Sequence, residues 1–182
     1  MSLTKKMVFT AICSALCVVL PMAFHAVPDA GTVFLPMHIP VLLCGLACGW
    51  PYGLACGILG PILSSLLTSM PPMAMLPSMA VECAVYGLAT GLGMTFIRTK
   101  NTYADLYISM ILAMLCGRTI AGFIKAWILS PGTPPFIWVT SSLVKGIPGI
   151  CIQLAVMPIL IFALTRTRFL PRRYESFKSA TK

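Results

Sequence analysis

Four charged side chains lie inside the long apolar stretches of this chain: Glu82, Arg118, Lys125 and Lys145. A charged residue at the centre of a membrane-spanning helix costs about 2.5–3.5 kcal/mol, so such residues usually line a cavity or pair with one another. Arg118 and Lys125 are seven residues apart, which is two helical turns, and they therefore share one face of a helix. We expect all four to surround one cavity.

Three of these groups are basic and one is acidic, which favours the binding of an anion. If Glu82 neutralises one partner, two positive charges remain, and a substrate carboxylate would satisfy them. A purely structural alternative stays open. Glu82 would then pair with Arg118 or a lysine and only fix helix packing, while Lys125 would extend its ammonium group to the outer lipid headgroups.

Two uncharged polar residues complete the candidate site. Gln153 follows Lys145 by eight residues and lies roughly on the same face, although such amides often only join helices by hydrogen bonds. His38 lies near the start of the second apolar stretch and could equally be an ordinary hydrogen-bonded histidine. The candidate substrate-binding residues are Glu82, Arg118, Lys125, Lys145, His38 and Gln153.

The composition indicates that lipid surrounds most of the chain. Of the 182 residues, 58% are hydrophobic and only 9% are charged, and the mean hydropathy is +0.93. A soluble domain carries about 25% charged residues. Since one crossing takes about 20 apolar residues as helix, the chain has room for five or six crossings within one membrane domain, residues 1–182.

The apolar stretches predict an all-α integral membrane protein with six transmembrane helices. Turn residues divide the chain into helices at roughly 3–24, 35–48, 52–67, 78–97, 106–129 and 136–164. The last is long enough to bend near Pro148 and Pro158. Glycines recur mostly every four residues through the second and third helices, and we expect them to form a smooth face for close packing or sliding, at positions 45, 49, 53, 57 and 60.

The basic residues predict the orientation. Six helices place both termini on one side, and most of the 13 basic residues fall on that side. By the positive-inside rule both termini are cytoplasmic, with a basic tail at roughly 165–182. These residues are Lys5, Lys6, Arg98, Lys100, Arg166, Arg168, Arg172, Arg173, Lys178 and Lys182.

The eight cysteines all lie in apolar runs, and we expect them to pack as small buried hydrophobes. No carboxylate or histidine stands at ligand spacing beside them, so we predict no metal site. The chain has no GxxxxGK[ST] loop for binding ATP phosphates. Ala11 and Ala15, in AICSA, are four residues apart and would let a second helix approach closely.

Three segments together carry a resemblance to a known family. They are the N-terminus with Ala11-x-x-x-Ala15, the segment LPMHIPVLLCGLACGWPYGLACGILGP at 35–61, and KGIPGICIQL at 145–154. With the six-helix, basic-tailed layout, the chain resembles the substrate-binding S components of energy-coupling factor (ECF) transporters. The resemblance covers nearly the whole chain.

The resemblance implies a subunit of a bacterial plasma-membrane importer that captures a vitamin or similar micronutrient near the outer face. It implies no enzymatic activity and no cofactor. The partners would be a transmembrane scaffold subunit and two ATPase subunits, with Ala11 and Ala15 on the docking surface. The second segment and the anionic preference favour pantothenate as substrate, while cobalamin or folate is also possible.

Two other functions are compatible with the residues. The first is a stand-alone small proton-coupled transporter or channel that uses Glu82. The second is an intramembrane enzyme, which would need a nucleophile with a base or a metal set. His25, His38 and Glu82 would make only a weak set of metal ligands, so transport is favoured over an enzymatic function.

Overall fold

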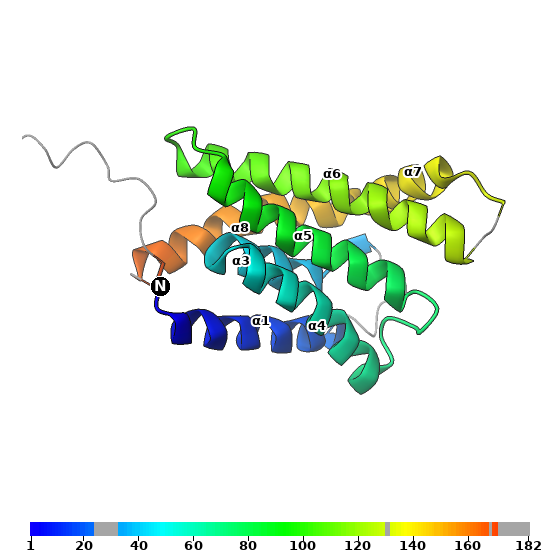
Figure 1. Ribbon diagram of the computed structural model, residues 1–182, viewed down its shortest axis with the longest axis horizontal. Coiled ribbons are helices and arrows are strands. Elements are labelled where there is room, and N and C mark those ends of the chain that lie inside the picture. The colour runs from blue at the N-terminus through cyan, green and yellow to red at the C-terminus, as the bar shows by residue number, and fades with distance from the viewer. Residues whose placement is uncertain (24–32, 130–131, 168, 171–182) are drawn as a thin grey trace, which may run out of the picture.

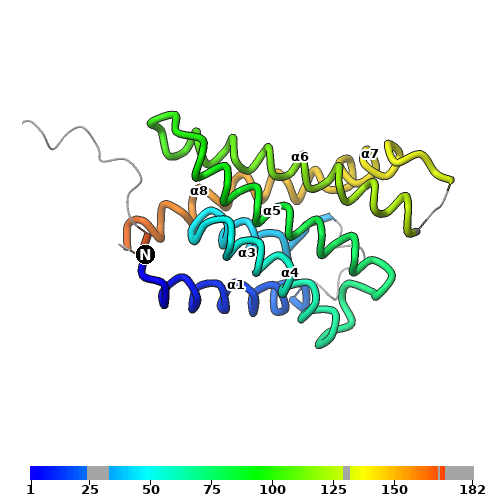
Figure 2. Tube along the Cα trace, viewed as in Figure 1, coloured from blue at the N-terminus to red at the C-terminus, as the bar shows by residue number. Residues whose placement is uncertain are grey.

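The computed structural model describes residues 1–23, 33–129, 132–167 and 169–170, and these residues form a helical bundle (Figures 1 and 2). The described part of the chain contains no β-strand, so the predicted all-helical class is confirmed. The helices are α1 (Leu3–Ala23), α3 (His38–Cys48), α4 (Trp50–Thr68), α5 (Leu76–Phe96), α6 (Thr102–Leu129), α7 (Pro135–Lys145) and α8 (Ile147–Arg166).

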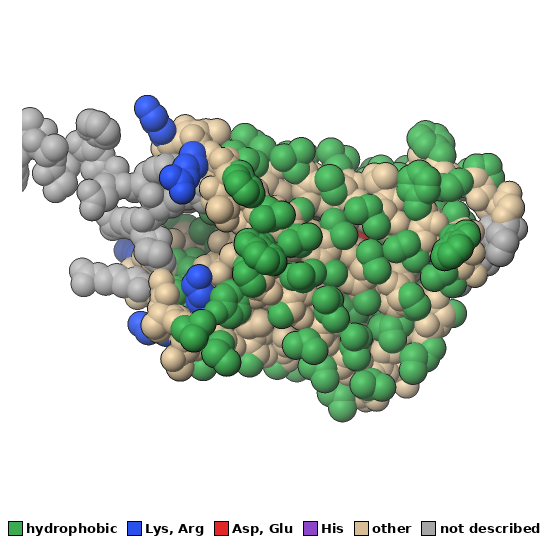
Figure 3. All heavy atoms as spheres, viewed as in Figure 1, with side chains coloured by type: hydrophobic (Ala, Val, Ile, Leu, Met, Phe, Trp, Pro, Cys, Tyr) green, Lys and Arg blue, Asp and Glu red, His purple; other side chains and the backbone are tan. Residues whose placement is uncertain are grey.

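Five helices, α1, α4, α5, α6 and α8, are long and apolar enough to cross a membrane. Between 22% and 44% of the residues in their most apolar windows are buried inside the bundle. The remaining apolar side chains cover the outside of the molecule, as the green surface in Figure 3 shows. An exposed apolar surface of this extent needs lipid around it. The chain is therefore a multipass membrane protein.

The second predicted helix is shorter than expected. α3 has 11 residues, so it is about 16 Å long, against about 30 Å for the hydrocarbon core of a bilayer. Nine of its residues are buried, from His38 to Cys48, and it packs against α1, α4 and α5. α3 is thus the enclosed centre of the bundle. A sixth crossing stays a prediction.

Glycines bring α3 and α4 into direct backbone contact with α5. A Cβ atom added to Gly57 would lie 2.6 Å from the carbonyl carbon of Cys83, and Gly53 faces Gly87 with no side chain between them. Gly45 lies against the Gly87 backbone as well. The predicted glycine face is therefore used for close packing inside the bundle. The expectation of a sliding face is not supported, because the bundle itself covers these glycines.

The last predicted helix is divided into α7 and α8, which meet at Gly146. The break lies two residues before Pro148, which occupies the first turn of α8, where proline fits because the N–H groups have no intrahelical partner. Pro158 lies within α8 and does not end it. Of the two prolines expected to bend this segment, only Pro148 lies close to the interruption.

Five of the eight basic residues in the described part of the chain lie at one end of the bundle. α1 begins there, the α5–α6 connection turns there, and α8 ends there (Figure 1), and blue side chains mark this end in Figure 3. The residues are Lys5, Lys6, Arg98, Lys100 and Arg166. The other predicted tail positions, Arg168, Arg172, Arg173, Lys178 and Lys182, lie outside the described residues.

The cysteines follow the prediction with two exceptions. All eight are free thiols, and six are buried. Cys116 on α6 and Cys151 on α8 are exposed, because each lies on a helix face that turns away from the bundle. The prediction of burial is wrong for these two residues.

Candidate functional site

The centre of the candidate site is the Glu82 carboxylate, two turns into α5 and only 5% exposed. Its Oε1 accepts a hydrogen bond of 3.1 Å from the Tyr86 hydroxyl, one turn further along the same helix face. Oε1 also lies 3.6 Å from Nε2 of His38 on α3. Oε2 lies 3.8 Å from Nζ of Lys125 on α6. One carboxylate therefore joins three helices.

His38 is almost fully buried at the first residue of α3. Its ring lies 5.1 Å from the Tyr86 ring, at an interplanar angle of 58°. Neither ring nitrogen has a hydrogen-bond partner among the described residues, since 3.6 Å to Glu82 is longer than a hydrogen bond. His38 therefore contacts Glu82 and Tyr86 while keeping donor and acceptor capacity unused.

Arg118 lies on the same face of α6 as Lys125 but turns toward the junction of α7 and α8. Its Nη1 donates to the carbonyl of Ser142, which also accepts the Gly146 N–H at 3.1 Å. A Cβ atom at position 146 would lie 2.5 Å from Nη2 and 2.8 Å from Cζ. Glycine at 146 therefore leaves the space that the guanidinium fills. The cation also complements the negative end of the α7 dipole.

The same layer of the bundle holds Arg118 and the Glu82 cluster. Gly117, the preceding residue, lies against the Tyr86 ring, which a side chain at 117 would displace. Arg118 and Glu82 form no ion pair within 4 Å. In a poorly solvated interior such charges interact over longer distances than in water.

Of the six predicted site residues, the structure brings His38, Glu82 and Lys125 into one cluster, with Arg118 in the same layer. Gln153 is buried on α8 and donates from Nε2 to the Leu35 carbonyl at 3.4 Å. Lys145 is exposed at the end of α7 and has no ion pair or hydrogen bond among the described residues. The expectation that it faces the shared cavity is therefore not supported.

Three residues belong to the site that the sequence did not single out for it: Tyr86, Ser142 and Gly146. Tyr86 could have been found, because it follows Glu82 by four residues. Trp138 has a buried indole N–H with no partner among the described residues, whereas Trp127 is 83% exposed. Ser142 acts through its backbone carbonyl, which no side-chain pattern marks.

The charges of the cluster favour an anion. Glu82 offsets Lys125 and the Arg118 charge remains, so one positive charge is spare. The prediction of two spare charges included Lys145, which is not part of this cluster. Two buried guanidinium nitrogens of Arg118, Nε and Nη2, have no hydrogen-bond partner among the described residues, and both are donors. In the described part of the chain, no three or more His, Cys, Asp and Glu side chains are grouped to hold a metal ion.

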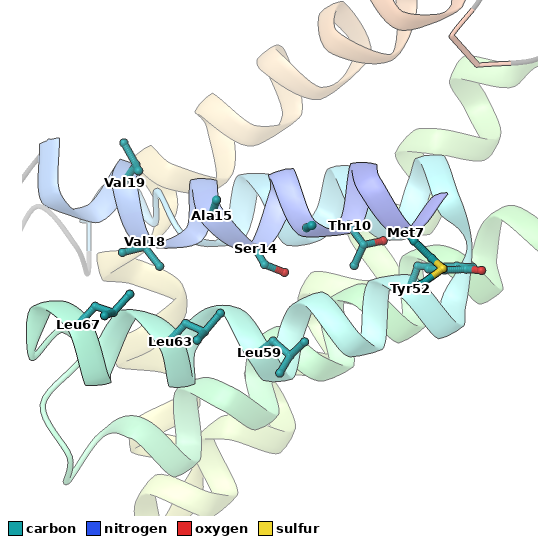
Figure 4. Close-up of a pocket in the computed structure, with 11 residues that line it drawn as sticks. Met7, Thr10, Ser14, Ala15, Val18, Val19, Tyr52, Leu59, Leu63 and Leu67 are labelled. Carbon is teal, nitrogen blue, oxygen red and sulfur yellow. The ribbon is translucent and has the colours of Figure 1, made fainter. Parts of the chain in front are cut away.

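A second feature is an apolar groove between α1 and α4, about 680 Å³ in volume (Figure 4). Leu59, Leu63 and Leu67 form the α4 wall. Ala11 and Ala15 lie exposed on the α1 side. The Ser14 hydroxyl is buried there without a hydrogen-bond partner among the described residues. The groove is open to a helix or chain that could pack into it.

One comparison with known proteins is informative. Residues 5–161 match the family described as "ECF transporter, substrate-specific component". No curated protein and no solved structure matches the chain.

Proposed function

Since the chain belongs to the family of ECF transporter substrate-specific components, we propose that it captures a small anionic nutrient for uptake driven by separate ATPase subunits. Members of this family are substrate-binding transport subunits and not enzymes. The observation that carries the anionic preference is the buried cluster of Glu82, Lys125, His38 and Arg118. It contains one more positive than negative charge, and an anion would balance it.

Pantothenate is the favoured substrate. It has a single carboxylate, which matches a single spare positive charge, and its hydroxyl and amide groups can use further hydrogen-bonding groups such as the Trp138 indole. Folate, with two carboxylates, and cobalamin, a much larger molecule, fit this charge balance less well. Both remain substrates to be tested.

The proposed orientation follows from the basic end of the bundle. Lys5, Lys6, Arg98, Lys100 and Arg166 lie at the end that holds the N-terminus and would be cytoplasmic by the positive-inside rule. The candidate site lies in the other half, because Glu82 is near the start of α5 and Lys125 is near the end of α6. In a bacterial plasma membrane with six crossings, that half would receive substrate from outside.

The α1–α4 groove is the proposed docking surface for the transmembrane scaffold subunit. Ala11 and Ala15 present small side chains to it, which allow a partner helix to approach the α1 backbone. The unpartnered Ser14 hydroxyl would gain a hydrogen bond from such a helix. The two ATPase subunits would act through the scaffold.

A second candidate function is transport by the lone chain, with Glu82 as a proton carrier. The observation that favours it is the buried carboxylate beside an imidazole, which is a common arrangement in proton relays. This function requires solute flux without any ATPase.

Binding calorimetry on the purified chain tests the proposal. We expect tight binding of pantothenate, or of another vitamin from a panel including folate and cobalamin, without ATP or partners. Arg118→Ala should weaken it, while Arg98→Ala, in the exposed α5–α6 connection, should not. Absence of binding together with solute flux through the lone protein in liposomes would support the second function instead.

Co-purification tests the docking surface. Ala11→Trp and Ala15→Trp should abolish assembly with the scaffold subunit and leave vitamin binding intact. Ala163→Trp, at an exposed position of α8, is the matched control and should still assemble. If both α1 variants assemble normally, the docking surface lies elsewhere.

A further inference from the structure

One of the three guanidinium nitrogens of Arg118 donates a hydrogen bond, and the other two have no partner among the described residues. Nη1 donates to the Ser142 carbonyl. Nε and Nη2 are buried and have no hydrogen-bond partner in the described part of the chain. These two nitrogens form one edge of the planar group, with nearly parallel N–H bonds. That edge matches the two oxygens of a carboxylate.

An unused edge of this kind lowers stability, because a buried donor without a partner costs about 1–3 kcal/mol, and more when the group is charged. Arg118 is only 3% exposed. The carboxylate of Glu82 does not fill the edge, since its oxygens lie against His38, Tyr86 and Lys125. The described residues supply no acceptor for this edge, and a bound ligand with two acceptor oxygens would account for the arrangement.

We propose that Arg118 binds a substrate carboxylate on its Nε–Nη2 edge while Nη1 keeps its bond to Ser142. This inference rests on the proposed function as a substrate-binding subunit. The substrate class is a monocarboxylate, because Glu82 offsets Lys125 and Arg118 alone carries the spare charge. An amide or alcohol in place of the carboxylate would offer the two donors one neutral acceptor oxygen in place of two charged ones, and the bonds would be weaker.

The same guanidinium would couple substrate binding to α7. This helix has no buried residue and packs mainly along α6. Its end is held by the Ser142 carbonyl, which bonds to both Arg118 and Gly146. A carboxylate that immobilises the guanidinium would therefore strengthen the attachment of α7 to α6. The amides of α7 should then exchange with solvent more slowly.

The first test uses the intact wild-type chain and three acids with their neutral counterparts. The pairs are pantothenate with panthenol, biotin with biotinamide, and nicotinate with nicotinamide, each titrated by calorimetry. We expect one acid to bind and its neutral counterpart to bind about 100-fold more weakly, because a site built around a hydrogen-bonding group rejects analogues that lack it. This test needs no substitution, so it does not depend on a variant folding.

The second test replaces Arg118 by lysine, which keeps the charge but lacks the fork of two donors. Arg118→Lys should weaken the bound acid about 30-fold and leave the neutral counterpart unchanged. Arg98→Lys makes the same replacement at an exposed position and should behave as wild type. Hydrogen exchange should show protection of α7 by the acid in wild type and not in Arg118→Lys.

The outcomes distinguish the carboxylate assignment from the proposed transport role. Equal affinity for an acid and its neutral counterpart, or full affinity in Arg118→Lys, overturns the carboxylate assignment and leaves the transport role standing. The same holds if the chain binds only an uncharged vitamin such as riboflavin. Failure to bind any vitamin contradicts both proposals. Unchanged exchange of α7 on binding of the acid overturns the coupling alone.

Discussion

The interface of α3 and α4 with α5 and the contact region of α6 with α7 and α8 are built in opposite ways. In the first, Gly45, Gly53 and Gly57 remove side chains so that helix backbones touch the α5 backbone. In the second, Arg118 reaches across to one backbone carbonyl, and α7 contributes no buried residue. The first region has little freedom to rearrange, because closely packed backbones cannot move apart without leaving voids. The second can adjust.

α5 connects the first region to α6 of the second, because Glu82 on α5 lies against Lys125 on α6. One face carries Gly87 into the glycine contacts, while Glu82 and Tyr86 form the polar cluster with α3 and α6. The acidic part of the site is therefore held by rigid packing. The arginine edge is held by a hydrogen bond at the end of a weakly attached helix.

The largest expected effect comes from breaking the rigid region. Gly87→Ala places a methyl group against the Gly53 backbone, which cannot give way, and should lower the free energy of unfolding by about 3 kcal/mol. Gly60→Ala is the matched control, because its Cβ would meet only the Cys17 side chain, at 2.8 Å from Sγ, and should cost about 1 kcal/mol. Denaturation in detergent measures both. Equal losses would contradict the difference between backbone and side-chain contact.

The next effect tests the point where the two regions join. Glu82→Gln removes the charge that faces Lys125 and should cost about 2 kcal/mol, less than a fully buried pair because the Lys125 side chain is 20% exposed. Adding Lys125→Met should restore about 1 kcal/mol of this loss. Strictly additive losses in the double-mutant cycle would show that the pair is not coupled.

A smaller effect is expected where the adjustable region is probed directly. Gly146→Ala would place a methyl group 2.5 Å from Nη2 of Arg118 and displace the guanidinium. Substrate affinity should fall about tenfold, which is about 1.4 kcal/mol. Ser142→Ala keeps the backbone carbonyl that Arg118 uses, so its affinity should match wild type. Calorimetry with the acid that binds in the proposed screen measures both, and equal affinity of Gly146→Ala and wild type would contradict the contact.

Tyr86→Phe removes one hydrogen bond to Glu82 without changing the shape of the side chain. The expected loss of stability is about 1 kcal/mol, typical of a single hydrogen bond. Ring contact with Gly117 and His38 should persist. A loss as large as that of Gly87→Ala would mean that the polar cluster, and not the glycine packing, dominates stability.

The smallest effect is expected at Lys145. Because this side chain is exposed, Lys145→Ala should change stability by no more than about 0.5 kcal/mol and substrate affinity by less than about twofold. Lys125→Ala, one helix away and paired with Glu82, should lower affinity more than tenfold. Similar losses in the two variants would return Lys145 to the site.

The bounds of the long apolar helices are the part of the fold that could be predicted from the sequence. α1, α4 and α5 lie within two residues of their predicted bounds, because long apolar runs ending in turn residues define them. α6 begins four residues before its prediction. Asp105, which the predicted bounds place just outside this helix, is instead buried in its first turn and accepts hydrogen bonds from the Thr99 N–H and hydroxyl at 2.8 and 2.7 Å.

The charged part of the site was predictable for the same reason. Glu82, Arg118 and Lys125 attract notice because charges in apolar helices are costly, and the structure places them in one layer. Lys145 is a lysine like Lys125, but it lies at the end of a helix, where exposing a charge costs little free energy. The Ser142 carbonyl and the space left by Gly146 could not be predicted, because they depend on where α7 ends against α6.

Because two of the eight thiols are exposed and six are buried, the natural sequence offers two attachment points for probes. Cys116 and Cys151 are exposed on the outside of the bundle, while the other six cysteines are enclosed. They lie on α6 and α8, on either side of the junction at Gly146. Spin labels or fluorophores at these two positions would report the separation of α6 and α8 in a bilayer without any engineered cysteine.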